Sequence, residues 1–266
     1  MNASSHTLEE TAVNALDLPL PEPFKAVFTT RHGGMSKGNY ESLNLALHVG
    51  DDPRRVRDNR RLAFTAHKLD SSRLIVAQQI HGAEAAIVSA SDAGRGSFSH
   101  ADAIEGCDAI VTRAANLPLM NLSADCLLLA LGDPQAKVLA VLHGGWRGIA
   151  AGIIQNTITL MRSAGAKPER IHVAGTPAIG RCCFEVGSDV VQTLGPDCVV
   201  RTENEKSFID LNRAALKRLT SAGVPEQQIQ LSSDCTCCRE DLFFSHRRCS
   251  KAGEKHTGRM ALIAWM

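Results

Sequence analysis

Aromatic side chains are scarce in this chain of 266 residues, which contains eight Phe, two Trp and one Tyr. Proteins that hold single-stranded nucleic acid stack the bases on aromatic side chains and attract the backbone with a positively charged groove. The formal net charge is only +1, so the chain offers no strong basic field either. We therefore expect no nucleic-acid partner and predict that the ligands are small molecules.

Long apolar runs are also missing. No uninterrupted apolar stretch approaches the roughly 20 residues that a membrane-spanning helix needs. The segment from Met1 to Pro23 contains no basic stretch followed by an apolar core, the pattern of a secretory signal. We expect no association with membranes and a cytoplasmic location.

The remaining composition, with 44% hydrophobic residues and nine cysteines, is that of a globular protein with enough apolar material for one large domain or two small ones. An odd number of cysteines in a chain of this size favours reduced thiols, a metal site or catalysis over a disulfide framework. Residues 1–23, which end in Pro19, Pro21 and Pro23, are predicted to form a flexible arm. No repeat or linker divides residues 24–266, which we predict to be one domain.

Predicted strands and helices alternate without a steady βαβ rhythm. This order favours an α+β fold in which mixed β-sheet is flanked by helices. Residues 89–105 are polar and are expected to form a long surface loop or lid. The predicted strands are 24–30, 73–80, 109–112, 126–131, 138–143, 171–174 and 261–265, and the predicted helices are 53–66, 146–163 and 211–222.

Two short apolar strands bring a cysteine and a histidine together. Strands 126–131 and 138–143 flank the turn signal Asp133-Pro134, which predicts a hairpin. If residues 133–136 form the turn, Cys126 lies opposite His143. Opposed residues have Cβ atoms about 4.5–5.5 Å apart on one face of a sheet. The thiol and the imidazole could then share a metal ion or form a nucleophile and base pair.

His81 follows another apolar strand and offers a third ligand. Three protein ligands with one open position are typical of catalytic zinc, and Asp125 could orient one of the imidazoles. The alternative is that Cys126 is a packed thiol and that backbone groups satisfy both histidines. The residues alone leave both interpretations open.

Two glycine-rich loops are candidate anion sites. Residues 144–148 precede a predicted helix, so backbone N–H groups and the Arg147 guanidinium could hold phosphate. Residues 31–34, which include Arg31, form a weaker example. Both loops could equally be simple turns.

Five further cysteines form two groups in the sequence. They could build a four-thiolate zinc site, a redox pair or only packed thiols, but paired C-x₂-C knuckles are missing. The pattern does not select among these alternatives for Cys182, Cys183, Cys235, Cys237 and Cys238.

Taken in order, the motifs of this chain resemble those of the polyphenol-oxidase or laccase-domain proteins, whose bacterial members are also called peptidoglycan-editing factors and purine nucleoside phosphorylases. Departures are small: Gly144 stands where alanine is usual and Arg181 where proline is common. The motifs that carry the resemblance are residues 30–36, 42–45, 50–53, 59–60, 78–82, 124–126, 143–148, 179–187 and 257–260.

The resemblance implies a YfiH-like sandwich fold and a metal site formed by His81, Cys126 and His143, usually filled by zinc, with copper possible. It implies phosphorolysis of adenosine, inosine or methylthioadenosine, and adenosine deamination as a further activity. Purine nucleosides and phosphate are thus the expected partners, while the oligomeric state is left open. By their positions in these motifs, the candidate substrate contacts are Arg31, Asn44, Arg60, Gln79 and Arg147, and Glu185 is a candidate supporting residue.

Three other functions stay open at this point. Cys126 with His143 as base could make the protein a cysteine hydrolase or amidase that acts on peptidoglycan precursors. A copper-dependent polyphenol oxidase is less favoured, because one mononuclear site lacks the copper cluster of laccases. The same residues could also serve a metal carrier without catalytic activity.

Overall fold

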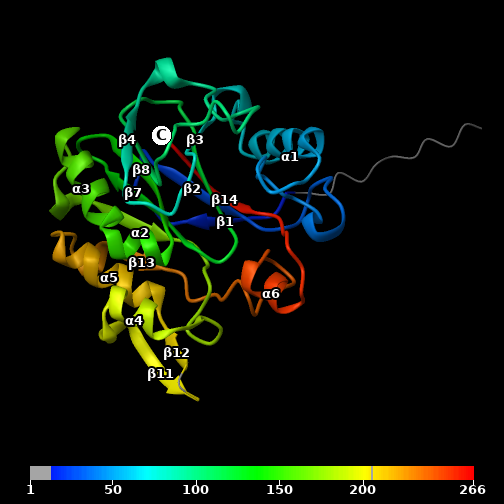
Figure 1. Cartoon of the computed structure of the whole chain (residues 1–266). Coiled ribbons are helices and arrows are strands. Elements are labelled where there is room, and N and C mark those ends of the chain that lie inside the picture. Colours follow the sequence, from blue (N-terminus) through cyan, green and yellow to red (C-terminus); the bar gives the residue numbers. More distant parts are fainter. Residues whose placement is uncertain (1–12, 205) are drawn as a thin grey trace, which may run out of the picture.

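Two β-sheets lie face to face at the centre of the computed structural model, which describes residues 13–204 and 206–266 (Figure 1). The first sheet has the order β1 (Ala15–Leu18), β2 (Lys25–Thr29), β14 (Met260–Trp265), β6 (Leu119–Ser123), β3 (Ile75–Val76). The second has the order β13 (Ile229–Leu231), β9 (His172–Gly175), β7 (Leu127–Asp133), β8 (Val138–Gly144), β5 (Ala109–Thr112), β4 (Ala85–Val88). A small third sheet consists of β10 (Glu185–Val186), β12 (Lys206–Ile209) and β11 (Val199–Glu203).

Apolar residues cover both faces of the central strands. In β7, Leu128 and Ala130 pack against the other sheet, whereas Leu127 and Leu129 pack against helices. Successive side chains of a strand point to opposite faces, so burial on both faces requires the continuous apolar runs seen in the sequence.

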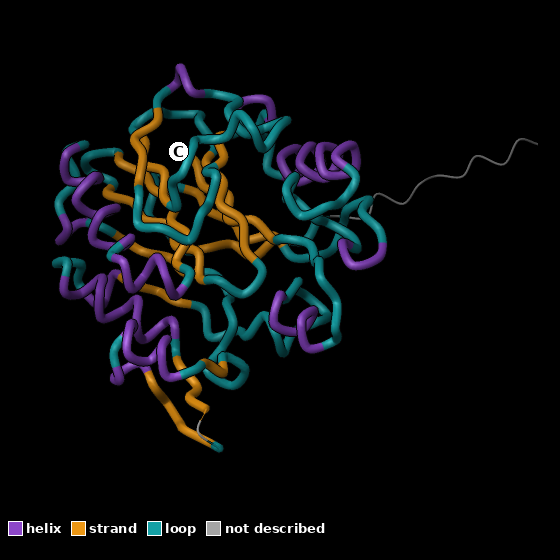
Figure 2. The backbone as a smooth tube through the Cα atoms, in the orientation of Figure 1, coloured by secondary structure: helices purple, strands orange, loops and turns teal. Residues whose placement is uncertain are grey.

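Helices close the two outer faces (Figure 2). α2 (Trp146–Ala151), α3 (Ile153–Ser163), α4 (Ser188–Leu194) and α5 (Leu211–Ser221) contribute to the core beside the six-stranded sheet. α1 (Pro53–Ala66) packs on the five-stranded sheet through Ala63 and Phe64. α6 (His246–Lys251) precedes the C-terminal strand β14 in the chain. This single domain with mixed sheets and flanking helices confirms the predicted α+β sandwich.

Some predicted elements differ from the structure. Part of the expected arm, Ala15–Leu18, is strand β1 and pairs with β2, while residues 1–12 lie outside the described part. The helix expected over 146–163 is two helices, because Gly152 adopts φ 98° between them. Only Ile75–Val76 of the strand expected over 73–80 is regular. Within the described residues, no helix is long and apolar enough to cross a membrane.

The hairpin register is shifted by two residues from the prediction. Leu128, not Cys126, lies opposite His143, and Asp133 ends the strand opposite Val138. The carboxylate of Asp133 accepts the backbone N–H groups of Gln135 and Ala136, so the turn begins one residue later than expected. A shift of two preserves the face on which each side chain lies.

Candidate metal and nucleoside site

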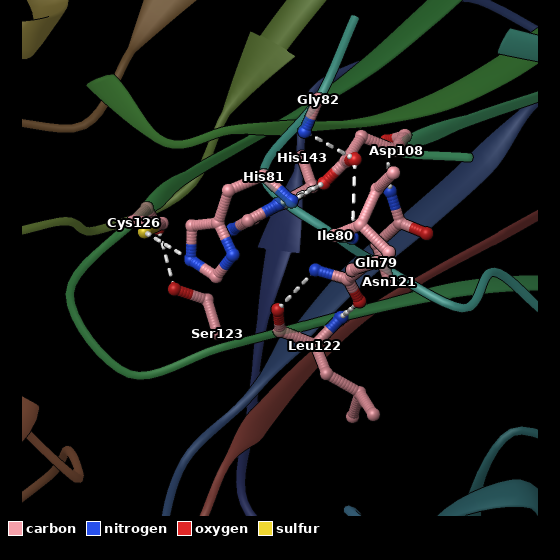
Figure 3. Close-up of polar contacts among 10 residues, drawn as sticks. All are labelled: Gln79, Ile80, His81, Gly82, Asp108, Asn121, Leu122, Ser123, Cys126 and His143. Carbon is pink, nitrogen blue, oxygen red and sulfur yellow. Dashed lines mark hydrogen bonds and ion pairs between the residues drawn. The ribbon is translucent and has the colours of Figure 1, made fainter. Parts of the chain in front are cut away.

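Three donor side chains meet at one end of the layer between the two large sheets. His81 follows β3 in a loop, Cys126 lies just before β7, and His143 is in β8. The ligand atoms of the three residues all lie within 4.8 Å of one another. The rings of the two histidines are nearly perpendicular, with centroids 4.7 Å apart. The structure thus brings together the three residues that the sequence identified as metal ligands (Figure 3).

Asp108 fixes both histidines, although the sequence analysis did not single it out. Its buried carboxylate lies 2.7 Å from Nδ1 of His143 and accepts the backbone N–H groups of Ile80, His81 and Gly82. A carboxylate only accepts, so Nδ1 of His143 carries the proton and Nε2 is the free ligand atom. The signal that could have revealed Asp108 is an acidic residue immediately before the buried strand β5.

His81 lies in a sharply bent segment with φ 60°. The three backbone N–H groups of Ile80, His81 and Gly82 converge on Asp108 and hold this bend. Nε2 of His81 lies 4.0 Å from Sγ of Cys126. The bend therefore directs the imidazole toward the thiol.

Asp125 supports Cys126 and not an imidazole, contrary to our expectation. Its carboxylate accepts the hydroxyls of Thr236 and Ser245 and the backbone N–H of Arg247. Its own φ is 96°, a conformation that a residue with a side chain rarely adopts. These bonds hold the turn that presents Cys126.

Gly145 leaves room for the three donors. A Cβ atom there would lie 3.1 Å from Cδ2 of His81 and 3.3 Å from Sγ of Cys126. A Cβ atom on Gly148 would lie only 2.7 Å from the carbonyl oxygen of Gly82. Gly145, at the start of α2, and Gly148, within α2, therefore allow this segment to approach the site closely.

The charges of Cys126 and His143 are coupled. Burial would raise the pKa of the Cys126 thiol, but His143 and His81 lower it to about 6. Burial would lower the pKa of His143, but Cys126 and Asp108 raise it to about 9. Without a metal, the pair is a thiolate beside an imidazolium at neutral pH. The thiolate is the form in which cysteine binds metals.

A cavity of about 310 Å³ opens beside the donors. Its size is at the lower end of the range for small-molecule sites. The cavity is lined by His48, Gln79, His81, Leu122, Ser123, Ala124, His143, His246 and Arg259.

Arg259 supplies positive charge to this cavity. Its Nη1 donates to the carbonyl oxygens of Thr257 and Gly258, whereas Nε and Nη2 have no acceptor among the described residues. The guanidinium remains cationic at neutral pH. The sequence analysis includes Arg259 within the motif at residues 257–260 but assigns it no role.

Most predicted substrate contacts lie elsewhere or are already hydrogen-bonded. Gln79 lines the cavity, but its amide both donates to and accepts from the backbone of Leu122. Asn44 and Arg60 are buried, and each is hydrogen-bonded to backbone groups. Arg60 donates to the carbonyl oxygens of Leu45, Gly96 and Ser97, and so holds the loop of residues 89–105 that was expected to be a lid.

The other three predicted residues do not line the cavity. Arg31 donates to the carbonyls of Glu41 and Glu240 and borders a separate surface pocket. Arg147 is exposed, with its guanidinium 4.3 Å from the centroid of the Trp146 ring. Glu185 forms an ion pair with Lys206.

Comparison with known proteins shows the family of this chain. Residues 25–266 match the family described as multi-copper polyphenol oxidoreductase laccase. The chain belongs to this family. It is 39% identical to purine nucleoside phosphorylase YlmD of Geobacillus stearothermophilus, over 84% of each chain. It is 35% identical to adenosine deaminase RL5 from an unknown prokaryotic organism, over 90% of this chain and 94% of the relative.

Solved structures of two related proteins have the same fold as this chain. The crystal structure of YlmD from Geobacillus stearothermophilus superposes with a TM-score of 0.89 at 36% identity, covering 96% of this chain and 98% of the other. A Bacillus licheniformis protein titled hypothetical protein YfiH gives a TM-score of 0.89 at 30% identity, covering 97% and 100%. The family identification and the sandwich fold are thus confirmed.

Proposed function

We propose that this protein is a metal-dependent purine nucleoside phosphorylase, which converts a purine nucleoside and phosphate into the free base and pentose 1-phosphate. The observation that carries the proposal is that the donor cluster of His81, Cys126 and His143 borders a cavity that its two histidines line together with the partly unpaired guanidinium of Arg259. The relative named purine nucleoside phosphorylase YlmD, which is 39% identical to this chain, supports the same reaction.

The donor set fits a zinc ion. Two imidazole nitrogens and one thiolate leave a fourth position open, as in catalytic zinc sites. Asp108 sets the tautomer of His143, and Gly145 provides the space beside the donors. His81, Cys126 and His143 would hold the ion, and a bound zinc would supply Lewis-acid polarisation of a substrate oxygen. The same donors suit copper, which competes strongly for such ligands.

Arg259 is the proposed phosphate contact. In phosphorolysis, a phosphate oxygen forms a bond to C1′ of the pentose while the bond from C1′ to the purine nitrogen breaks. The base leaves with the electron pair and takes a proton. The unpaired N–H groups of Arg259 are suited to neutralise and orient phosphate. We retain Gln79 as a wall of the nucleoside site, held rigid by Leu122.

Adenosine deamination is proposed as a side reaction in the same cavity, because one relative is named adenosine deaminase. In that reaction water replaces the amino group at C6 of the purine and ammonia leaves. We also propose a cytoplasmic location, which the nine unpaired cysteines support.

A second candidate function rests on Cys126, whose Sγ lies within 4.8 Å of a ring nitrogen of each histidine. A thiolate beside an imidazolium is also the resting state of cysteine hydrolases, so hydrolysis of peptidoglycan precursors is the alternative. Polyphenol oxidation has less support, since neither potential metal cluster of the described residues contains more than two histidines.

Product analysis separates these functions. Zinc-loaded protein is incubated with adenosine or inosine, with and without phosphate, beside the Cys126→Ala variant. If the protein is a phosphorylase, adenine or hypoxanthine should form together with an equal amount of pentose 1-phosphate. These products should appear only when phosphate is present and only with the native protein. Phosphate-independent inosine from adenosine indicates deamination as the main reaction. Absence of every nucleoside product would refute the proposal and lead to tests with peptidoglycan precursors.

A further inference from the structure

Four cysteines outside the cavity meet in space. Cys182 and Cys183 lie between β9 and β10, and Cys235 and Cys238 lie between β13 and α6. Their sulfur atoms all lie within 4.8 Å of one another. The two segments are joined by a β-bridge between Ala178 and Cys235, so the fold itself aligns them.

The spacing of the sulfur atoms fits a tetrahedral metal site. Sγ of Cys238 lies 3.4 Å from Sγ of Cys183 and 3.5 Å from Sγ of Cys182. A zinc ion bound at about 2.3 Å from each sulfur separates the sulfurs by about 3.8 Å. A disulfide would require about 2.05 Å. The nearly equal approach of Cys238 to two partners also favours a shared ion over a bond to one of them.

The surroundings are built to hold thiolates. The backbone N–H of Gly180 donates to Sγ of Cys235 at 3.2 Å. A Cβ atom on Gly180 would lie 3.0 Å from Cβ of Cys235 and 3.3 Å from Sγ of Cys182, so glycine provides needed space. Arg247 and Arg248 donate to the carbonyl oxygens of Cys183 and Cys237. Their positive charges oppose the net −2 of a dication with four thiolates.

The same two segments hold the loop that carries Cys126. Asp125 accepts the hydroxyl of Thr236 with its carboxylate, and its carbonyl oxygen accepts the backbone N–H of Ile179. Thr236 lies beside Cys235, and Ile179 lies three residues before Cys182. An ion that ties the segments together would therefore fix Asp125 from both sides.

We propose that Cys182, Cys183, Cys235 and Cys238 form a second metal site, in which four thiolates hold a zinc ion that clamps the two segments around Asp125. A closed shell of four protein ligands makes this zinc structural, in contrast to the open site in the cavity. The proposal does not depend on the proposed reaction.

Zinc content per chain tests the proposal. Protein purified under reducing conditions and loaded with zinc is freed of excess metal and analysed by elemental mass spectrometry. The native protein should hold two zinc ions, Cys126→Ala one, Cys238→Ser one and the double variant none. Cys237→Ser is the matched control, a neighbouring thiol outside the cluster, and should hold two. Native zinc content in Cys238→Ser would overturn the proposal.

A second measurement tests the proposal if the Cys238→Ser variant does not fold. X-ray absorption at the zinc edge of Cys126→Ala reports only the second site and should show four sulfur ligands at about 2.3 Å. A first shell dominated by nitrogen or oxygen, or a disulfide at Cys238 in reducing buffer, would overturn the proposal. If the native protein binds two zinc ions but does not catalyse phosphorolysis, only the proposed function is refuted.

Discussion

Replacing Asp108 by asparagine should weaken the metal site selectively. One carboxylate oxygen accepts from Nδ1 of His143 and the backbone of His81, and the other accepts from Gly82 and Ile80. An asparagine keeps one acceptor and turns an NH₂ group toward two donors. Two donors around the buried carboxylate then lose their acceptor, which costs at most about 2–6 kcal/mol of folding free energy at about 1–3 kcal/mol for each fully buried donor.

The effect on metal binding is separate from this loss of stability. Outer partners of ligating histidines typically contribute about 10–100-fold to metal affinity. We therefore expect the zinc dissociation constant of the cavity site to rise by about that factor, measured by competition with a chromophoric chelator. Thermal denaturation curves are recorded first, so that zinc affinities are compared only between proteins that are folded.

Asp133→Asn is the matched control for this experiment. Asp133 is equally buried and accepts from Gln135, Ala136, Lys167 and Arg170, but it lies at the far end of the hairpin. It should lower the melting temperature and leave zinc affinity unchanged. If folded Asp108→Asn binds zinc in the cavity as tightly as the native protein, the role assigned to Asp108 is refuted.

Further predictions concern the thiol, the glycine loop and the two arginines. In metal-free protein, the rate of alkylation of Cys126, followed by peptide mass spectrometry, should be maximal above pH 7. It should fall as the pH is lowered, with a midpoint near pH 6, because the thiolate is protonated below its pKa. A midpoint near pH 9 would contradict the coupling to His143. Gly145→Ala should lose zinc from the cavity site, because its Cβ would press on the donor side chains, whereas Gly144→Ala should retain it, because its Cβ would meet Leu127 and Ile149 and none of the donors; equal zinc contents would show that Gly145 does not limit the site. Arg259→Gln should raise KM for phosphate about 10- to 150-fold, the effect of about 1.5–3 kcal/mol from a charged hydrogen bond, and Arg147→Gln should not; the reverse result would return phosphate to the glycine loop.

The helices and strands whose bounds depend on local sequence patterns were predicted best. α1 begins at Pro53 and ends at Ala66 as expected, because Asp52 caps its first turn. β5 has the predicted bounds, set by a buried apolar run. Prediction failed where one residue changes the backbone. Gly152 divides a helix whose apolar spacing continues across it, and the side chain of Asp133 moves a turn by one residue.

The site was partly predictable for the same reason. Cys126 and His143 stand at the same end of the β7–β8 hairpin, where the alternation of side chains along the strands places both on one face. His81 joins them through the bend that follows β3. Asp108 and Arg259 reach the site from strand ends 151 residues apart in the chain, and their contacts depend on tertiary pairing that spacing does not encode. Conversely, Arg60 matched a family motif but binds three carbonyl oxygens within the fold.

Metal dependence of phosphorolysis tests the central claim most directly. Phosphate-dependent release of adenine from adenosine is measured in native protein, after chelation, and after zinc is restored, with Cys126→Ala treated in parallel. The account predicts that activity is lost on chelation, returns with zinc, and is absent throughout in the variant. Phosphate-dependent adenine release that survives chelation or persists in Cys126→Ala would contradict it.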